Sequence, residues 1–120
     1  IVHYDFGDAI RSACNSAGEE TRNLDEVVFN MAFFEAFTAG FMEKAKHLFT
    51  LREKKTLAQG CILMTYLQAV RFLTDYLEGD TYFKIAREQH NLDRCRTQFG
   101  LVEDMEKKWT EMGQIVDSFC

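Results

Sequence analysis

The sequence predicts an all-α protein, and three features of its composition support this. Proline is absent from the 120 residues, where an average usage of about 5% would give about six. Only seven residues are glycine, too few for the many tight turns of a chain of short strands. Hydrophobic residues make up 47% of the chain, enough to form a buried core. We therefore expect one helical domain of four to five helices over residues 1–120.

Polar residues and apolar spacing predict two helices in the first half of the chain. The first spans residues 5–14, where Asp5 is expected to cap the first free backbone amides. Residues 15–25 (NSAGEETRNLD) are polar and rich in turn formers, so a surface loop is expected there. Over residues 31–45 apolar side chains recur three and four positions apart, which predicts an amphipathic helix with Asn30 as its N-cap.

Two longer helical patterns occupy the second half. Thr50 and Glu53 fit a capping box, in which each side chain accepts a hydrogen bond from the other residue's backbone amide. The pattern that opens there continues as far as Gly79, a residue that favours the left-handed conformation found just beyond helix ends. A last helix is expected to begin at Asn91 or Asp93 and to run almost to the end of the chain.

The composition also argues against several classes of partner. Lys and Arg total 14 against 19 Asp and Glu, and a net charge of −5 does not suit binding to nucleic acid. Residues 61–77 are apolar, but Arg71 and Asp75 would each cost about 2.5–3.5 kcal/mol in the middle of a membrane span.

The four cysteines form no CxxC pair, and no signal segment opens the sequence. We expect a cytoplasmic protein with reduced cysteines, three of them buried.

A polar stripe on the third predicted helix is the strongest candidate for a binding site. Its members stand at i, i+3, i+7 and i+10 and so share one helix face: Gln68, Arg71, Asp75 and Glu78. One interpretation is a solvated face with an Arg71–Asp75 ion pair worth about 0.3–0.5 kcal/mol. The other is a hydrogen-bonding wall for a polar ligand, which Tyr82 and Phe83 would close with an aromatic face.

Other motifs in the chain are weak. Residues 5–7 read Asp-Phe-Gly, the letters that carry the magnesium-binding Asp in protein kinases, but only four residues precede them where a strand is needed. The three histidines (His3, His47 and His90) have no Asp or Cys at metal-ligand spacing. No nucleophile elbow, phosphate loop or glycine-rich fingerprint occurs. No catalytic or metal-binding residue is therefore assigned within this segment.

Four segments carry a family resemblance: residues 3–11 (HYDFGDAIR), 34–37 (FEAF), 71–84 (RFLTDYLEGDTYFK) and 90–98 (HNLDRCRTQ). They resemble the C-terminal part of aminoglycoside-phosphotransferase-like small-molecule kinases, specifically the N-acetylhexosamine 1-kinase group. The resemblance covers nearly the whole chain, and residues 71–84 are its most specific part. It implies the helical C-terminal subdomain of a protein-kinase-like fold, whose strand-rich N-terminal lobe and catalytic loop would precede Ile1.

The resemblance also implies a function. The parent protein would phosphorylate a small acceptor, an amino sugar, using ATP and Mg²⁺ held by residues outside this segment, and the segment alone would not be catalytic. Arg71 and Tyr82 match positions that contact the sugar, with Asp75, Asp8 and Arg11 as weaker candidates lining the same cavity. Asp5 would support the missing catalytic loop. The implied partners are the acceptor and the missing N-terminal part of the same protein.

A different class of function remains open. The chain could be a free-standing helical bundle that binds a protein partner through an apolar groove, because 11 Phe, 4 Tyr and 1 Trp exceed what a small core buries. It could also be a helical domain that binds a sugar without catalysis. The stretch before Ile1 discriminates between them, since a kinase parent must encode there a catalytic Asp loop and a magnesium-binding Asp.

Overall fold

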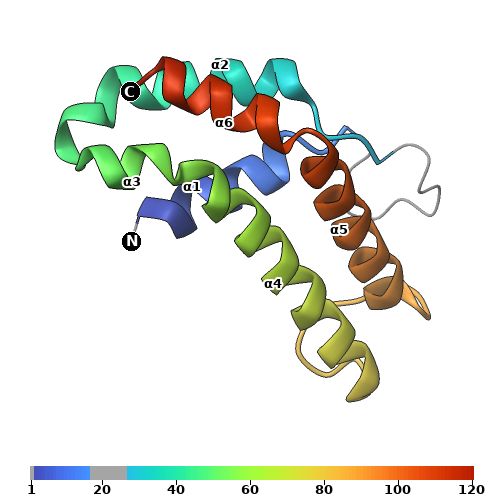
Figure 1. Ribbon diagram of the computed structural model, residues 1–120. Coiled ribbons are helices and arrows are strands. Elements are labelled where there is room, and N and C mark those ends of the chain that lie inside the picture. Colours follow the sequence, from blue (N-terminus) through green and yellow to red (C-terminus); the bar gives the residue numbers. More distant parts are fainter. Residues whose placement is uncertain (1, 17–26) are drawn as a thin grey trace.

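The computed structural model describes residues 2–16 and 27–120. In these ranges the chain forms six α-helices, one short 3-10 helix and no strand (Figure 1): α1 (Val2–Ala13), α2 (Met31–Ala45), η2 (Lys46–Leu48), α3 (Leu51–Lys55), α4 (Leu57–Leu77), α5 (His90–Lys107) and α6 (Trp109–Ser118). The predicted all-α class is confirmed. Most of the predicted loop at 15–25 lies outside the described residues. None of the helices in the described ranges has both the length and the apolar character needed to cross a membrane.

Six α-helices replace the four to five expected because the two longest patterns are each interrupted at one residue. Thr56 separates α3 from α4, and Lys108 separates α5 from α6, both with φ near −105° and ψ near 10°. The Thr56 hydroxyl donates to the Arg52 carbonyl (2.8 Å), an acceptor that a backbone amide uses in a regular helix. The Lys108 ammonium donates to the Phe29 carbonyl (2.9 Å), a partner distant in sequence. The apolar spacing continues across both breaks and so does not reveal them.

The predicted end signals are confirmed at three places. The Asn30 side chain accepts a hydrogen bond from the Phe33 amide (3.0 Å), which makes it the N-cap of α2. Thr50 and Glu53 form both hydrogen bonds of the capping box at the start of α3. Gly79 follows the C-cap of α4 with φ of 97°, in the region that glycine adopts at no steric cost.

Two predicted helix starts are wrong. Helix α1 already begins at Val2, so Asp5 lies inside the helix with an exposed side chain and does not cap it. Helix α5 begins at His90, ahead of Asn91 and Asp93, and follows Gln89 in the left-handed conformation. In both cases the polar residue lies within the first turn or so, where it resembles a cap in sequence but has helical backbone.

The packing of α1 against α4 depends on two glycines. A Cβ atom on Gly7 would lie 2.2 Å from the Gly60 carbonyl oxygen, and one on Gly60 would lie 2.4 Å from the His3 carbonyl oxygen. The two helix backbones therefore touch where they cross. Nearby, His3 Nε2 and the Thr56 hydroxyl form a hydrogen bond of 2.7 Å, which fixes the N-terminal end of α1 against the start of α4.

The molecule divides into two regions, which we call the base and the arm. The arm comprises residues 65–98, the distal part of α4 and the first half of α5, which run side by side away from the other helices (Figure 1). The base is the rest, in which α2 packs beside α6. The radius of gyration is 15.0 Å. A compact chain of this length would have about 13.6 Å, so the arm makes the molecule elongated.

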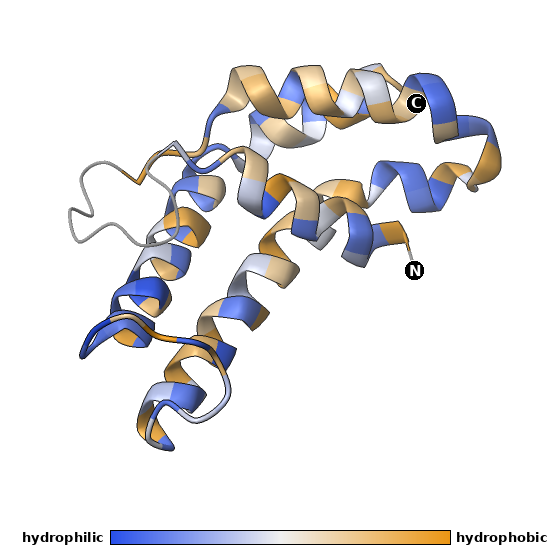
Figure 2. Cartoon of the chain, turned by 180° about the vertical axis from the view of Figure 1, so that it is seen from behind, coloured by the Kyte–Doolittle hydropathy of each residue, from blue (hydrophilic) through white to orange (hydrophobic). Residues whose placement is uncertain are grey.

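The interiors of the two regions differ in kind. The buried members of the main hydrophobic cluster lie in the base, and none falls between Cys61 and Leu101. Seven of the eight buried polar or charged residues in the described part of the chain lie in the arm: Thr65, Asp75, His90, Asn91, Asp93, Thr97 and Gln98. Figure 2 shows the same contrast along the ribbon, with more hydrophilic residues on α5 than on α2.

The cysteines lie where the sequence predicts. Cys14, Cys61 and Cys95 are buried, Cys120 is partly exposed, and all four are free thiols. Burial raises the pKa of the Cys14 thiol to about 11, which keeps it protonated at neutral pH. Cys14, Cys61 and Cys95 are therefore packing residues of the interior.

Candidate functional site

The candidate site lies at the free end of the arm, where residues 78–89 connect α4 to α5. This segment has no helix or strand of its own, so its shape depends on side chains from the two helices. Asp75 supplies the main contact: its carboxylate accepts hydrogen bonds from the backbone amides of Tyr82 (2.7 Å) and Phe83 (3.0 Å). The Asp75 carbonyl also accepts from the Asp80 amide (2.8 Å).

A buried carboxylate of this kind must have its acceptor positions filled. Asp75 is only 4% exposed. Its burial by itself would raise the pKa of the carboxyl group, but the hydrogen bonds from the Phe83 and Tyr82 amides and from Asn91 together hold the pKa below its usual value. Asp75 is thus a charged anchor for the connecting segment.

For Asp75 this geometry contradicts the interpretation of the polar stripe as a solvated face, whereas Arg71 and Glu78 are exposed as that interpretation expects. Asp75 is not part of a solvated face, and no ion pair joins it to Arg71 within the described residues. The Arg71 side chain donates instead to Gln68 (3.4 Å). Helical spacing brings Arg71 and Asp75 onto one face, but the connecting segment folds back and takes up the Asp75 carboxylate.

Asn91 completes the anchor, a role that the sequence did not reveal. Its side-chain amide is buried and donates to Asp75 (2.7 Å) and Asp80 (3.1 Å), which ties the start of α5 to the end of α4. The Ala86 amide donates to His90 Nδ1 (3.0 Å), so two consecutive residues of α5 hold the segment. In the sequence Asn91 shows only as a helix-start signal, since its partners lie 11 and 16 positions away.

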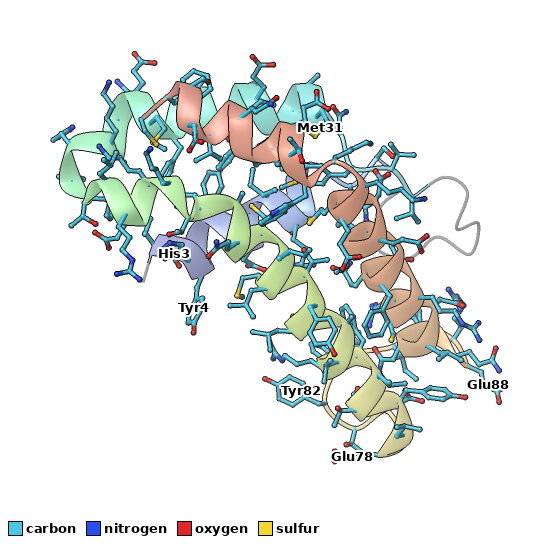
Figure 3. The ribbon with its side chains drawn as sticks, viewed as in Figure 1. His3, Tyr4, Met31, Glu78, Tyr82 and Glu88 are labelled. Atoms are coloured by element: carbon cyan, nitrogen blue, oxygen red, sulfur yellow. The ribbon has the colours of Figure 1, made fainter. Side chains whose placement is uncertain are left out.

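Above this anchor the segment presents a shallow cavity of about 380 Å³, which we call the cup. Its lining residues come from one face of α4 and from the connecting segment: Val70, Arg71, Thr74, Asp75, Glu78, Tyr82 and Phe83. In Figure 3, Tyr82 and Glu78 lie at the distal end of α4, remote from α2 and α6. The cup thus unites Arg71, Asp75 and Tyr82, three of the predicted ligand-contacting residues, with the predicted aromatic neighbour Phe83.

The wall of the cup combines a cation with two aromatic rings. The Arg71 guanidinium carbon lies 5.8 Å from the Tyr82 ring centroid and 5.5 Å from that of Phe83. The two rings meet edge to face at 4.9 Å. No carboxylate of the described residues forms an ion pair with Arg71. The arrangement offers charged hydrogen-bond donors beside an apolar surface, and Glu78 adds an exposed carboxylate.

The three predicted site residues on α1 do not join the cup. Asp8 and Arg11 pair with each other (2.9 Å), and neither is among the residues that line the cup. Asp5 is exposed and makes no side-chain hydrogen bond or ion pair with any described residue. Helix α1 crosses α4 near Gly60, more than two turns before Arg71, which places α1 toward the base.

The described residues that line the cup do not form a recognisable set of catalytic groups. Its buried carboxylate, Asp75, is already engaged by backbone amides, and the cup has no Ser, Cys or His. Among the described residues, no three His, Cys, Asp or Glu side chains gather closely enough to hold a metal ion. No protein-family model matches the chain.

Proposed function

We propose that this chain is the acceptor-binding helical part of an ATP-dependent phosphotransferase that acts on an amino sugar of the N-acetylhexosamine class. The proposal joins the resemblance over residues 71–84 to one observation: Arg71 and Tyr82, the two matched sugar-contacting positions, lie on the same cavity. They are 11 positions apart in sequence, and only the folded-back connecting segment brings them together.

The chemistry of the cup suits a hydroxylated ring. A sugar presents an apolar C–H face, which packs on aromatic rings, and hydroxyl groups, which accept from a guanidinium and donate to a carboxylate. Tyr82 and Phe83 supply the rings, while Arg71 and Glu78 supply the donor and the acceptor. The volume of about 380 Å³ lies within the range of about 300–1,000 Å³ typical of small-molecule sites.

In the proposed reaction the γ-phosphoryl group of ATP passes to a hydroxyl of the sugar. Catalysis of this kind depends on positioning and on charge neutralisation by magnesium. Under this proposal ATP, Mg²⁺ and the catalytic Asp would be held by residues encoded before Ile1, and this segment would position the acceptor. The exposed Asp5 carboxylate would accept hydrogen bonds from the catalytic loop.

The test is made on the longest translated product that contains these residues. The coding region before Ile1 is sequenced for a catalytic Asp loop and a magnesium-binding Asp, and the product is assayed with ATP, Mg²⁺ and a panel of hexosamines. We expect R71A to raise the KM for the sugar or to lower kcat, with the KM for ATP unchanged. R52A, which removes an exposed arginine of α3 outside the cup, is the matched control. Unchanged sugar kinetics in R71A would overturn the assignment.

A second candidate function rests on the outer face of α4. Five large apolar side chains are exposed along it: Leu63, Tyr66, Leu67, Val70 and Leu77. A free-standing bundle could use this face to bind a protein partner. Intact mass decides between the candidates: a translated product of about the 14.0 kDa of this chain favours the bundle, and a much heavier one with its extra residues before Ile1 favours the phosphotransferase.

A further inference from the structure

Charge is distributed unevenly in this chain, and the segment that joins α2 to α3 is basic. We call residues 43–55 the basic corner; they include the last turn of α2, η2 and α3. The corner contains five Lys or Arg residues against two Glu, a net charge of +3. The other 107 residues contain nine against 17, a net charge of −8. In Figure 1 the chain turns back at this corner, far from the free end of the arm.

The cations of the basic corner are available to a partner. All five are exposed or partly exposed, and none forms an ion pair with a described residue: Lys44, Lys46, Arg52, Lys54 and Lys55. The exposed carboxylates of Glu43 and Asp117 do not pair with them. The Glu53 carboxylate accepts from the Thr50 amide instead (2.9 Å). The corner therefore offers several unpaired cations to an anionic surface.

Two exposed leucines lie among these cations. Leu48, at the end of η2, is 67% exposed, and Leu51, at the start of α3, is 55% exposed. The C-terminal end of a helix stabilises nearby cations, which accounts for the charges but gives no reason to expose leucines. Leucines that project among Lys and Arg side chains suit a partner with an anionic surface over an apolar interior.

The packing beneath the corner holds both leucines outward. Between them, the Phe49 ring stacks on Phe41 with centroids 6.2 Å apart and planes 7° apart. Both rings pack against the main hydrophobic cluster of the base. The capping box of Thr50 and Glu53 fixes the next turn of the chain. The positions of the leucines are thus set before any partner binds, so that binding orders little backbone.

We propose that the basic corner binds the surface of an anionic phospholipid bilayer, with Leu48 and Leu51 inserted at the level of the headgroups and the five cations around them on the lipid anions. Charge complementarity selects this partner. A nucleic acid would engage the cations but leave the leucines in water, and an apolar protein groove would engage the leucines but not the cations. A bilayer surface engages both.

The experiment measures co-sedimentation with phospholipid vesicles of the longest translated product that contains these residues. The probes are phosphatidylcholine vesicles with about 30% phosphatidylserine and vesicles of phosphatidylcholine alone. We expect saturable binding to the anionic vesicles, weakened by added salt, and about tenfold weaker binding to the neutral ones. Neither ATP nor sugar is present, so the outcome is independent of the proposed phosphotransferase function.

Paired variants locate the contact. L48S/L51S should weaken binding to the anionic vesicles by about tenfold, because two apolar side chains no longer enter the interface. L63S/L77S removes two exposed leucines of α4 outside the corner and should leave binding unchanged.

A second pair tests the charge. K44Q/K46Q should weaken binding by about tenfold or more, because each cation near an anionic surface contributes about fivefold. K84Q/K107Q removes the same charge from two exposed lysines outside the corner and should change binding by less than about twofold. All the substituted side chains are exposed, and circular dichroism shows whether the variants keep their helices.

Four results would overturn the proposal. The first is equal binding to both kinds of vesicle, or binding to neither. The second is unchanged binding of L48S/L51S, which would mean that charge alone attracts a polyanion such as a nucleic acid. The third is equal weakening by K44Q/K46Q and K84Q/K107Q, which would mean attraction to net charge without a defined surface. The fourth is tighter binding to polyglutamate than to the vesicles, which would mean an acidic protein partner.

Discussion

The base and the arm are stabilised by opposite means. In the base, aromatic side chains pack together: Phe34 lies 6.3 Å from Phe6 and 5.6 Å from Phe29, measured between ring centroids. In the arm, Asp75 and Asn91 form a buried hydrogen-bonded network. Hydrophobic contacts are non-directional and tolerate small shifts, whereas a buried carboxylate is stable only with its donors in place. The comparison teaches that the base provides stability and the arm provides a defined geometry for the cup.

The base should respond most strongly to the loss of an aromatic ring. F34A removes a fully buried ring and should lower the free energy of unfolding by about 3–5 kcal/mol. Urea unfolding followed by circular dichroism measures the change. F33A, which truncates the exposed neighbouring ring of the same helix, is the control and should change stability by less than about 1 kcal/mol. Similar losses for both variants would contradict the location of the core.

The crossing of α1 and α4 in the base should tolerate no added atom. G7A places a Cβ atom 2.2 Å from the Gly60 carbonyl oxygen, so α1 and α4 must separate, at a cost of about 1–3 kcal/mol. The matched control is G40A in α2, where nothing lies within 4 Å of the new Cβ atom. This control should stabilise the chain by about 0.5–1 kcal/mol because alanine favours the helix. A stabilised G7A would refute the close crossing.

In the arm, removal of the anchor charge should act locally. D75N replaces two acceptor oxygens by one oxygen and an amide that faces the Tyr82 and Phe83 N–H groups, so the connecting segment should loosen. We expect hydrogen exchange of these two amides to accelerate at least severalfold, with the base amides unchanged. D117N changes an exposed carboxylate of α6 and serves as the control. Loosening spread evenly over both regions would argue against a separate arm.

Acidification should destabilise the chain by a smaller amount. Burial by itself would raise the pKa of the Asp75 and Asp104 carboxyl groups. Their hydrogen bonds outweigh this effect and hold both pKa values below the ordinary Asp value near 3.8. The partners of Asp104 are the Lys108 ammonium and the Phe29 amide. The stabilisation from both carboxylates is complete above about pH 4 and is lost as the pH falls through the lower native values. Unfolding in urea at pH 6 and at pH 3 measures this loss, and D104N should make it smaller. An equal pH dependence in D104N would exclude Asp104 as a contributor.

Local signals predicted much of the fold. The Asn30 cap, the capping box at Thr50 and the end at Gly79 each depend on residues within a few positions, and all three are confirmed. The apolar spacing does not reveal the breaks at Thr56 and Lys108 because it continues across both. The Thr56 hydroxyl bonds the nearby Arg52 carbonyl and the distant His3, and the Lys108 ammonium bonds the distant Phe29 carbonyl.

The site was predictable in its members more than in their roles. Helical spacing and the aromatic pair after Gly79 grouped Arg71 with Tyr82 and Phe83, as the cup shows. The same spacing placed Asp75 at the cup but did not reveal its role as an anchor, because its partners belong to a segment without regular structure and to the start of the next helix. A rule based on neighbours within one helix cannot describe a carboxylate whose donors lie 7 to 16 positions away.

The contact of Gly7 with Gly60 has a mechanical consequence for the cup. From Gly60 to the end of α4 the helix continues without a break for about 25 Å, at about 1.5 Å per residue. If α4 pivots on α1 by about 5°, the distal end moves by about 2 Å over this length. A displacement of about 1 Å can cost about 100-fold in a reaction that depends on alignment. Two glycines remote from Arg71 therefore fix the position of the cup, and under the proposed function their substitution should change sugar binding even where the chain stays folded.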